Sequence, residues 1–330
     1  MTVNLAIVPP RVGLAVLVVI ALAASGPVWL SAVRLNEANA ELLHLLPAAE
    51  GTLPHCHDRN ASSGSAETIA PRGWAGLVAA KQATAEGACS QALAMLAGAR
   101  DPEAARLQAV NCLAAGQYDC ARQALMIIGM PRSVAVWLGD IGVEQAQTGS
   151  DAVAVETFRL AEAFAPLPTV GLRQYATSLG KLGFKDEGTL VLQEAVRRDP
   201  HDAESHYALS QALSRANPDS QDALTEAEAA VNLRDYFPYH YLLGSMYMRV
   251  ARLDDAAQQF QFGLTSNSFD ALSALGDVAA AQGHLPEAAE FYVRALAIAD
   301  RPYVRERLHQ VCASQQTTEQ TAPAVCREEG

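Results

Sequence analysis

The densest group of candidate metal ligands in the sequence is the run His55-Cys56-His57-Asp58. Imidazole nitrogen, thiolate sulfur and carboxylate oxygen are the groups that hold zinc and related ions. Adjacent residues of an extended chain point to opposite sides, so these four side chains cannot close one tetrahedral shell without a strained loop or further ligands. We therefore expect no metal site here, with Cys56 in a disulfide and the histidines solvated in a loop. An enzyme built on this cluster is the alternative.

No enzyme motif accompanies that cluster. The sequence has no phosphate-binding loop ending in Gly-Lys-Ser/Thr, no Gly-x-Ser-x-Gly turn, no His-Glu-x2-His and no dinucleotide fingerprint. No two cysteines are separated by two residues, which excludes a thioredoxin-like redox site and covalent haem attachment. The sequence thus predicts a protein that is not an enzyme and needs no cofactor.

Six cysteines follow the amino-terminal segment, and their even number favours disulfides. Six cysteines allow 15 connectivities, so the pairing stays open at this point. The sequence-nearest pairing joins Cys56 with Cys89, Cys112 with Cys120, and Cys312 with Cys326. Disulfides indicate an oxidising compartment such as the bacterial periplasm. The alternative is a cytosolic helical protein with buried free thiols.

Residues 12–33 carry no charged side chain and match a bilayer in length. As a helix they would span about 33 Å, close to the roughly 30 Å of the hydrocarbon core. Trp29 near the outer end suits an anchor at the membrane interface, whereas one arginine on each side leaves the orientation undecided. We predict an uncleaved transmembrane signal-anchor behind a short tail at 1–11; a cleaved signal sequence is the alternative.

Charge and composition narrow the classes of function and fold. The chain of 330 residues has a formal net charge of −12, the wrong sign for a surface that binds nucleic acid by releasing counterions. Hydrophobic residues make up 50% and aromatic residues only 6%, and alanine dominates the apolar share. This favours closely packed helices over a strand-built core, and a wholly disordered chain is excluded.

The chain beyond the anchor falls into four parts. Residues 34–72 form a juxtamembrane helix and a linker rich in proline, glycine and serine. Residues 73–134 hold degenerate helical repeats, and 135–302 hold five regular ones. Residues 303–330 form a capping helix and a polar tail. A cap is expected because the last repeat would otherwise expose its apolar face.

The regular repeats show as matching residues about 34 positions apart. In the second helix of each unit a small residue, a usually larger apolar residue and another small residue stand at i, i+4 and i+7, on one helix face. These sets are Ala154-Phe158-Ala161, Gly188-Leu192-Ala195, Ala223-Ala227-Ala230, Ala256-Phe260-Gly263 and Ala288-Tyr292-Ala295. The first helices match at Leu209-Ser210, Leu243-Gly244 and Leu275-Gly276, and the turns at Gly149, Gly183 and Gly283. Stacked helix pairs bury these faces in a continuous core.

This pattern resembles the tetratricopeptide repeat family, whose unit is a helix-turn-helix of 34 residues. The resemblance covers 135–302 and implies an all-α, right-handed α-solenoid with an inner groove. Its units begin at Ala135, Thr169, Ala203, Phe237 and Phe269. The sequence departs from the family at Gly188, where alanine is usual, and at Tyr175-Ala176, where Leu-Gly is usual.

The resemblance also implies where a partner would bind, because peptides lie against first-helix side chains in that family. The corresponding residues here are Arg173, Tyr207, Gln211, Arg215, Tyr241, Ser245, Arg249 and Asp277. Tyrosine and arginine are enriched in binding hot spots. The alternative is that each is an ordinary solvated helix residue. The Lys/Asn arrangement that clamps a terminal carboxylate in some members is missing.

The sequence as a whole predicts a non-catalytic, membrane-anchored scaffold or adaptor in the bacterial cell envelope. Its location would be the inner membrane, with a single span and the soluble domain in the periplasm, and its partners would be envelope or membrane proteins. The alternative is an accessory subunit of an envelope enzyme complex, for surface polysaccharide polymerisation or ligation or for cytochrome assembly.

Overall fold

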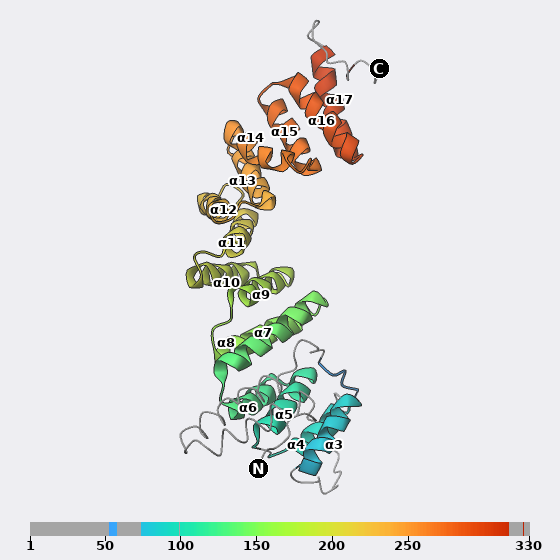
Figure 1. Cartoon of the computed structure of the whole chain (residues 1–330), viewed down its shortest axis with the longest axis vertical. Coiled ribbons are helices and arrows are strands. Elements are labelled where there is room, and N and C mark those ends of the chain that lie inside the picture. The colour runs from blue at the N-terminus through green and yellow to red at the C-terminus, as the bar shows by residue number, and fades with distance from the viewer. Residues whose placement is uncertain (1–52, 58–73, 99, 317–325, 327–330) are drawn as a thin grey trace, which may run out of the picture. The chain divides into compact units, whose positions relative to one another are not determined.

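The computed structural model describes residues 53–57, 74–98, 100–316 and 326, and the regular structure within these ranges is all helical (Figure 1). The chain divides into two units, Met1–Ile141 and Gly142–Gly330. The predicted tail and anchor at 1–33 lie outside the described residues, as does most of the predicted linker. Within the described part, no helix combines the length and the apolar character needed to cross a bilayer.

The first unit contains two helix pairs followed by the start of a longer helix. Its helices are α3 (Trp74–Ala85), α4 (Cys89–Leu96), α5 (Pro102–Ala114), α6 (Tyr118–Ile128) and the beginning of α7 (Pro131–Gln147). Disulfides join Cys56 to Cys89 and Cys112 to Cys120, with Cα atoms 5.4 and 5.7 Å apart. The second bond connects α5 to α6 across their turn and closes a loop of 8 residues, whereas the first joins the segment before α3 to the start of α4, 33 residues away.

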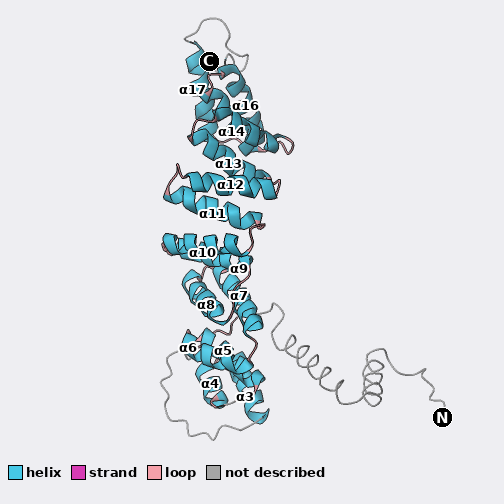
Figure 2. Ribbon diagram, turned by 90° about the vertical axis from the view of Figure 1, so that its left-hand side faces the viewer, coloured by secondary structure: helices cyan, strands magenta, loops and turns pink. Residues whose placement is uncertain are grey.

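The second unit is a row of helices in which each helix packs on the one before it and the one after it (Figure 2). After the end of α7 it contains α8 (Asp151–Phe164), α9 (Thr169–Lys181), α10 (Lys185–Arg198), α11 (Ala203–Ala216), α12 (Gln221–Leu233), α13 (Phe237–Arg249), α14 (Leu253–Gln261), a 3-10 turn at Phe262–Leu264, α15 (Phe269–Ala281), α16 (Leu285–Ile298) and α17 (Pro302–Gln316). First helices of adjacent repeats also touch, as α9 and α11 do, and packing between adjacent repeats is typical of repeat proteins. The all-helical repeat fold predicted from the sequence is thus present.

The repeat register follows the residue spacing of the sequence. Helices α9, α11, α13 and α15 begin at Thr169, Ala203, Phe237 and Phe269. Helix α7 is different, because it begins at Pro131, before Ala135, and its residues are divided between the two units. Proline fits the first turn of a helix, where its missing N–H would have no helical partner, which explains the earlier start.

Glycine in a first helix faces an aromatic ring in the second helix of the same pair. A Cβ atom on Gly244 would lie 2.7 Å from Phe260, and one on Gly276 would lie 2.5 Å from Tyr292. Phe260 and Tyr292 are among the largest fully or almost fully buried side chains. Where the first helix has Ala176 instead, the second helix has the smaller Leu192, and both are buried in one cluster. The volumes of the two facing positions are therefore matched in these three pairs.

The turns within the helix pairs use left-handed backbone geometry. Gly149, Gly183 and Gly283 have φ values of +81°, +91° and +80°, and they stand at the turn positions read from the sequence. The equivalent position after α13 holds Ala251, which takes φ +57° in spite of its Cβ. A non-glycine residue in this conformation costs roughly 1–2 kcal/mol.

The carboxyl end of the second unit is closed by α17. Val304 and Leu308 of this helix are buried against Leu272 and Tyr292 in a single core cluster. A disulfide joins Cys312 of α17 to Cys326, with Cα atoms 5.4 Å apart. Helix α17 therefore covers the apolar face that α16 would otherwise expose.

Candidate functional site

The eight residues of the predicted groove all lie on first helices of the second unit. Arg173 is on α9, and Asp277 is on α15. Tyr207, Gln211 and Arg215 are on α11, and Tyr241, Ser245 and Arg249 are on α13. They differ in what they contact, and the structure divides them into three groups.

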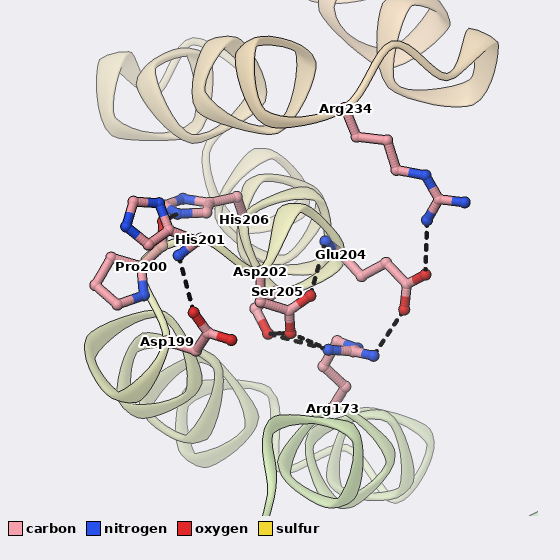
Figure 3. Close-up of polar contacts among 9 residues, drawn as sticks. All are labelled: Arg173, Asp199, Pro200, His201, Asp202, Glu204, Ser205, His206 and Arg234. Atoms are coloured by element: carbon pink, nitrogen blue, oxygen red, sulfur yellow. Dashed lines mark hydrogen bonds and ion pairs between the residues drawn. The ribbon is translucent and has the colours of Figure 1, made fainter.

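The first group consists of Arg173, which is held between two repeats (Figure 3). Its guanidinium forms an ion pair with Asp202 and donates to Glu204 Oε2 at 2.7 Å and to Ser205 Oγ at 3.3 Å. Only 14% of the side chain is exposed. Glu204 in turn accepts from Arg234 at 3.2 Å, so α9, α11 and the end of α12 are joined by one polar network. Arg173 therefore has little freedom to contact a partner.

Asp202 is the centre of that network and begins α11 as its N-cap. Its carboxylate accepts from the Glu204 backbone N–H at 3.2 Å and from Ser205 Oγ at 2.7 Å. Burial raises the pKa of this carboxyl, but the hydrogen bonds from Ser205 and Thr169 and the charge of Arg173 outweigh it, so the pKa is lowered. Asp202 therefore stays ionised at neutral pH and holds two consecutive first helices together.

The second group consists of Asp277, which attaches the capping helix. Its carboxylate accepts from Tyr292 Oη at 2.8 Å and from Arg307 Nη1 at 2.6 Å, and Arg307 belongs to α17. Burial raises the pKa of this carboxyl in spite of both partners. Asp277, Tyr292 and Arg307 also line a pocket of about 390 Å³ under α17. Asp277 is thus occupied by contacts within the protein.

The third group lies on α11 and α13 and includes the tyrosines. The Tyr207 ring lies 4.9 Å from the ring of Tyr239, and Tyr241 is 39% exposed with its ring 5.6 Å from Phe260. Ser245 donates its hydroxyl to the Tyr241 carbonyl at 2.7 Å. Desolvation by the surrounding chain raises the pKa of both Tyr207 and Tyr241, so both phenols are neutral at physiological pH. The two rings are held in place and partly accessible.

Gln211 and Arg215 line a pocket of about 490 Å³ that is formed by α9, α10 and α11. Its floor is made of small and aliphatic side chains, among them Ala176, Leu192 and Ala212. Three basic side chains border it, namely Lys181, Lys185 and Arg215, together with one acidic side chain, Asp186. An apolar floor with a few polar groups at its edge is typical of a binding pocket.

Lys181, Arg215 and Arg249 stand at the same position of three consecutive repeats, 34 residues apart. Lys181 Nζ donates to Asp151 at 3.1 Å, Arg215 donates to Gln211 at 3.4 Å, and Arg249 donates to Ser214 Oγ at 2.7 Å. The partners of the two arginines are neutral side chains of the first helices. Their charges therefore remain available at the surface.

The sequence analysis missed Lys181 and Lys185. Lys181 had a usable signal, because it stands 34 residues before Arg215. Lys185 had none, because it begins the second helix of its pair, and the family's groove is assigned to first helices. Gly188 also lines the pocket, and the sequence marked it only as a departure from the repeat pattern.

The histidine and cysteine run of the linker forms a backbone contact and a disulfide. Cys56 is bonded to Cys89, and the His57 N–H donates to the Gly87 carbonyl at 3.0 Å. Asp58 lies outside the described residues. Within the described ranges, no three histidine, cysteine, aspartate or glutamate side chains are grouped so that they could hold a metal ion.

Two histidines of the second unit are enclosed by hydrogen bonds within the fold. His206 contacts Glu226 through Nδ1 at 2.5 Å and the Pro200 carbonyl through Nε2 at 3.1 Å. His240 contacts Gln259 at 2.8 Å and Asp235 at 3.1 Å. Both histidines occupy equivalent places in α11 and α13. Each connects its first helix to the second helix of the same pair, α12 or α14.

No protein-family model matches the chain, and no curated protein matches it either. Among solved structures it is similar to a MamA protein at 18% identity and a TM-score of 0.46, over 58% of this chain and 98% of that one. It is similar to MamA of Desulfovibrio magneticus RS-1 at 23% identity and a TM-score of 0.37, over 50% of this chain and 93% of that one.

A third similar structure is TTC0263, a thermophilic TPR protein of Thermus thermophilus, at 22% identity and a TM-score of 0.41. The match covers 52% of this chain and 96% of that one. At these values the likeness carries no conclusion about function. The fold is of the tetratricopeptide type, and this rests on the helix order, the register and the neighbour packing of the chain itself.

Proposed function

We propose that this protein is a non-catalytic interaction scaffold that binds a segment of a partner protein on the first helices of its second unit. The observation that carries the proposal is the pocket between α9, α10 and α11, and the partly exposed tyrosines of α11 and α13 add to it. Tyrosine rings give rigid contact area at a low entropic cost, and arginine adds directional hydrogen bonds. An extended segment fits such a surface because it can contact several repeats at once.

We also propose that the scaffold is anchored in the inner membrane by residues 12–33, with the repeats in the periplasm. Support for the compartment comes from the three disulfides, since such bonds persist in oxidising environments. Support for the anchor comes from the length and the uncharged sequence of 12–33. The partners would then be other envelope or membrane proteins.

The binding surface is tested by co-purification of the full-length protein from its native membrane in mild detergent. The double variant Gln211→Ala and Tyr241→Ala should lose the stoichiometric companion. The matched control is Leu190→Ala with Ile298→Ala, because these side chains are 64% and 42% exposed on the second helices α10 and α16. Circular dichroism should show the same helix content in all three proteins. A companion retained by the Gln211 and Tyr241 variant would overturn the assignment of the surface.

The anchor and the compartment are tested separately. A variant without residues 1–33 should leave the membrane fraction after high-salt washing, whereas the full-length protein should stay. Thiols trapped with acid in intact cells should be absent from the full-length protein, as expected for three disulfides. Free thiols in that sample would place the repeats on the reducing side.

A further inference from the structure

Taking the proposed function as its basis, we propose that the bound partner segment is acidic, and that its carboxylates pair with Lys185, Arg215 and Arg249. The proposal concerns a protein segment with aspartate or glutamate side chains, spaced by small apolar residues that fit the aliphatic floor of the pocket. Four observations support it: the absence of carboxylate partners, the repeat register, the composition of the pocket border and the location of Lys185.

Most arginines in the described part of the second unit already have carboxylate partners. Those in ion pairs are Arg159, Arg173, Arg197, Arg198, Arg234, Arg252, Arg305 and Arg307. By contrast, no carboxylate of the described residues pairs with Lys185, Arg215 or Arg249, and all three side chains are exposed. Acidic residues outnumber basic ones in the chain, 36 to 24, so a shortage of carboxylates does not explain why these three cations lack a carboxylate partner.

The register places these cations in line with the repeats. Arg215 and Arg249 are equivalent residues of α11 and α13, and Lys181 is their counterpart in α9. A partner running across consecutive repeats would therefore meet a cation in each one. Lys181 is partly neutralised by Asp151 at 3.1 Å, so the stronger contacts should fall on Arg215 and Arg249.

The border of the pocket has a net positive charge, although the chain as a whole has a net charge of −12. Lys181, Lys185 and Arg215 oppose the single carboxylate of Asp186. A local charge opposite to that of the whole protein favours an anionic segment at this place, and it repels cationic ones. The negative charge of the remaining chain disfavours nucleic acid, which presents a long uniform row of phosphates.

The helix dipole offers an alternative explanation for the location of three basic side chains. Lys181, Arg215 and Arg249 lie in the last turns of their helices. Cations are stabilised there by the partial negative charge of the helix end. The same argument fails for Lys185, which is the first residue of α10, where a cation is unfavourable. A ligand-binding role accounts for both locations.

The test uses the full-length protein in detergent and a fluorescent peptide of alternating glutamate and alanine, amidated at its carboxyl end. A peptide with glutamine in place of glutamate is the neutral comparison. We expect the acidic peptide to bind more tightly than the neutral one, and Arg215→Gln to weaken it about tenfold, as for the loss of one charge-assisted hydrogen bond. Lys185→Gln and Arg249→Gln should also weaken it, and higher salt should do the same in the wild type.

The matched controls are Arg294→Gln and Arg301→Gln, which remove exposed cations that do not line the pocket and that form no ion pair with a described carboxylate. They should leave the affinity unchanged. The proposal would be overturned by equal binding of the acidic and neutral peptides, by no binding of the acidic peptide, or by equal effects of the pocket and control variants. The proposal would also be overturned if a single-stranded oligonucleotide bound more tightly than the acidic peptide and the same variants abolished that binding. The ligand would then be nucleic acid.

The native companion separates this inference from the proposed function. If Gln211→Ala with Tyr241→Ala releases the companion while Arg215→Gln with Arg249→Gln retains it, the scaffold stands and the acidic partner is refuted. If neither double variant releases it, both proposals fail. Release by both double variants, but not by Arg294→Gln with Arg301→Gln, supports both.

Discussion

The matched volumes of Gly244 and Phe260 predict a specific non-additive effect on stability. A Cβ on Gly244 would lie 2.7, 2.9 and 3.0 Å from three carbon atoms of the Phe260 ring, which is 2% exposed. The ring is packed among Leu243, Ala256 and Leu275 and cannot withdraw to solvent. Gly244→Ala should therefore force α13 and α14 apart or push the ring out of its preferred rotamer.

Two opposing effects determine the magnitude of the single substitution. Alanine is a better helix former than glycine by about 1 kcal/mol. Overpacking of a filled core costs about 1–3 kcal/mol, and distances under 3.0 Å place this site towards the upper end. We expect Gly244→Ala to lower the free energy of unfolding by about 1–2 kcal/mol. Phe260→Leu should lower it by about 1–2 kcal/mol, less than the 3–5 kcal/mol of a complete Phe→Ala truncation.

The double variant should recover much of this loss. It recreates the pair found in α9 and α10, where Ala176 faces Leu192 in a buried cluster. We expect it to be more stable than the sum of the single effects predicts by about 1–2 kcal/mol. Hydrogen exchange of the α13 and α14 amides, read by mass spectrometry on the full-length protein, measures each opening free energy locally. Additivity of the two substitutions within about 0.5 kcal/mol would refute the matched-volume explanation.

Two further substitutions test the inter-repeat network and the turn geometry. Asp202→Asn keeps a capping side chain but removes the charge that pairs with Arg173, so it should lower the free energy of unfolding by about 1–2 kcal/mol at pH 7. Because the folded-state pKa of Asp202 is lowered, its contribution is complete above the ordinary aspartate pKa and is lost as pH falls through the folded value. Urea unfolding of wild type and variant should therefore differ at pH 7 and converge towards pH 2, and a constant difference would contradict the assignment. Ala251→Gly relieves the left-handed alanine and should raise stability by about 1 kcal/mol, whereas Gly283→Ala, at the equivalent turn, should lower it; thermal unfolding checks both, and equal signs would contradict the turn argument.

The repeat register could be read from the sequence because the signals were local and recurred. Small and large residues alternate on one helix face, and glycine stands where the backbone takes positive φ, so Phe237 and Phe269 could be identified as helix starts. The start of α7 could not, because Pro131 extends that helix before the repeat pattern begins. Periodicity reports which face is buried, and it says less about where a helix ends.

The candidate site was less accessible to sequence reasoning. Arg173 and Asp277 occupy groove positions, but their charges are taken up by Asp202 and Arg307, which lie 29 and 30 residues away. Such ion pairs depend on the distance between neighbouring repeats, which a pattern within one repeat does not contain. Lys185 was not predicted, because it lines the pocket from the second helix of a pair and the predicted groove residues were all on first helices.

The placement of the disulfides has a consequence for how this array opens. All six cysteines lie outside 135–302, four of them before it and two after it. In a linear array, thermal opening starts at the terminal units, because these have a neighbour on one side only. The Cys56–Cys89 bond acts on the first described helix pair of the first unit, and the Cys312–Cys326 bond acts on the capping helix of the second unit, so both suppress fraying there. Because the disulfides supply stability, the central repeats can carry small and polar residues at α9 to α11. Without the disulfides, the same stability would require a larger apolar core in these repeats.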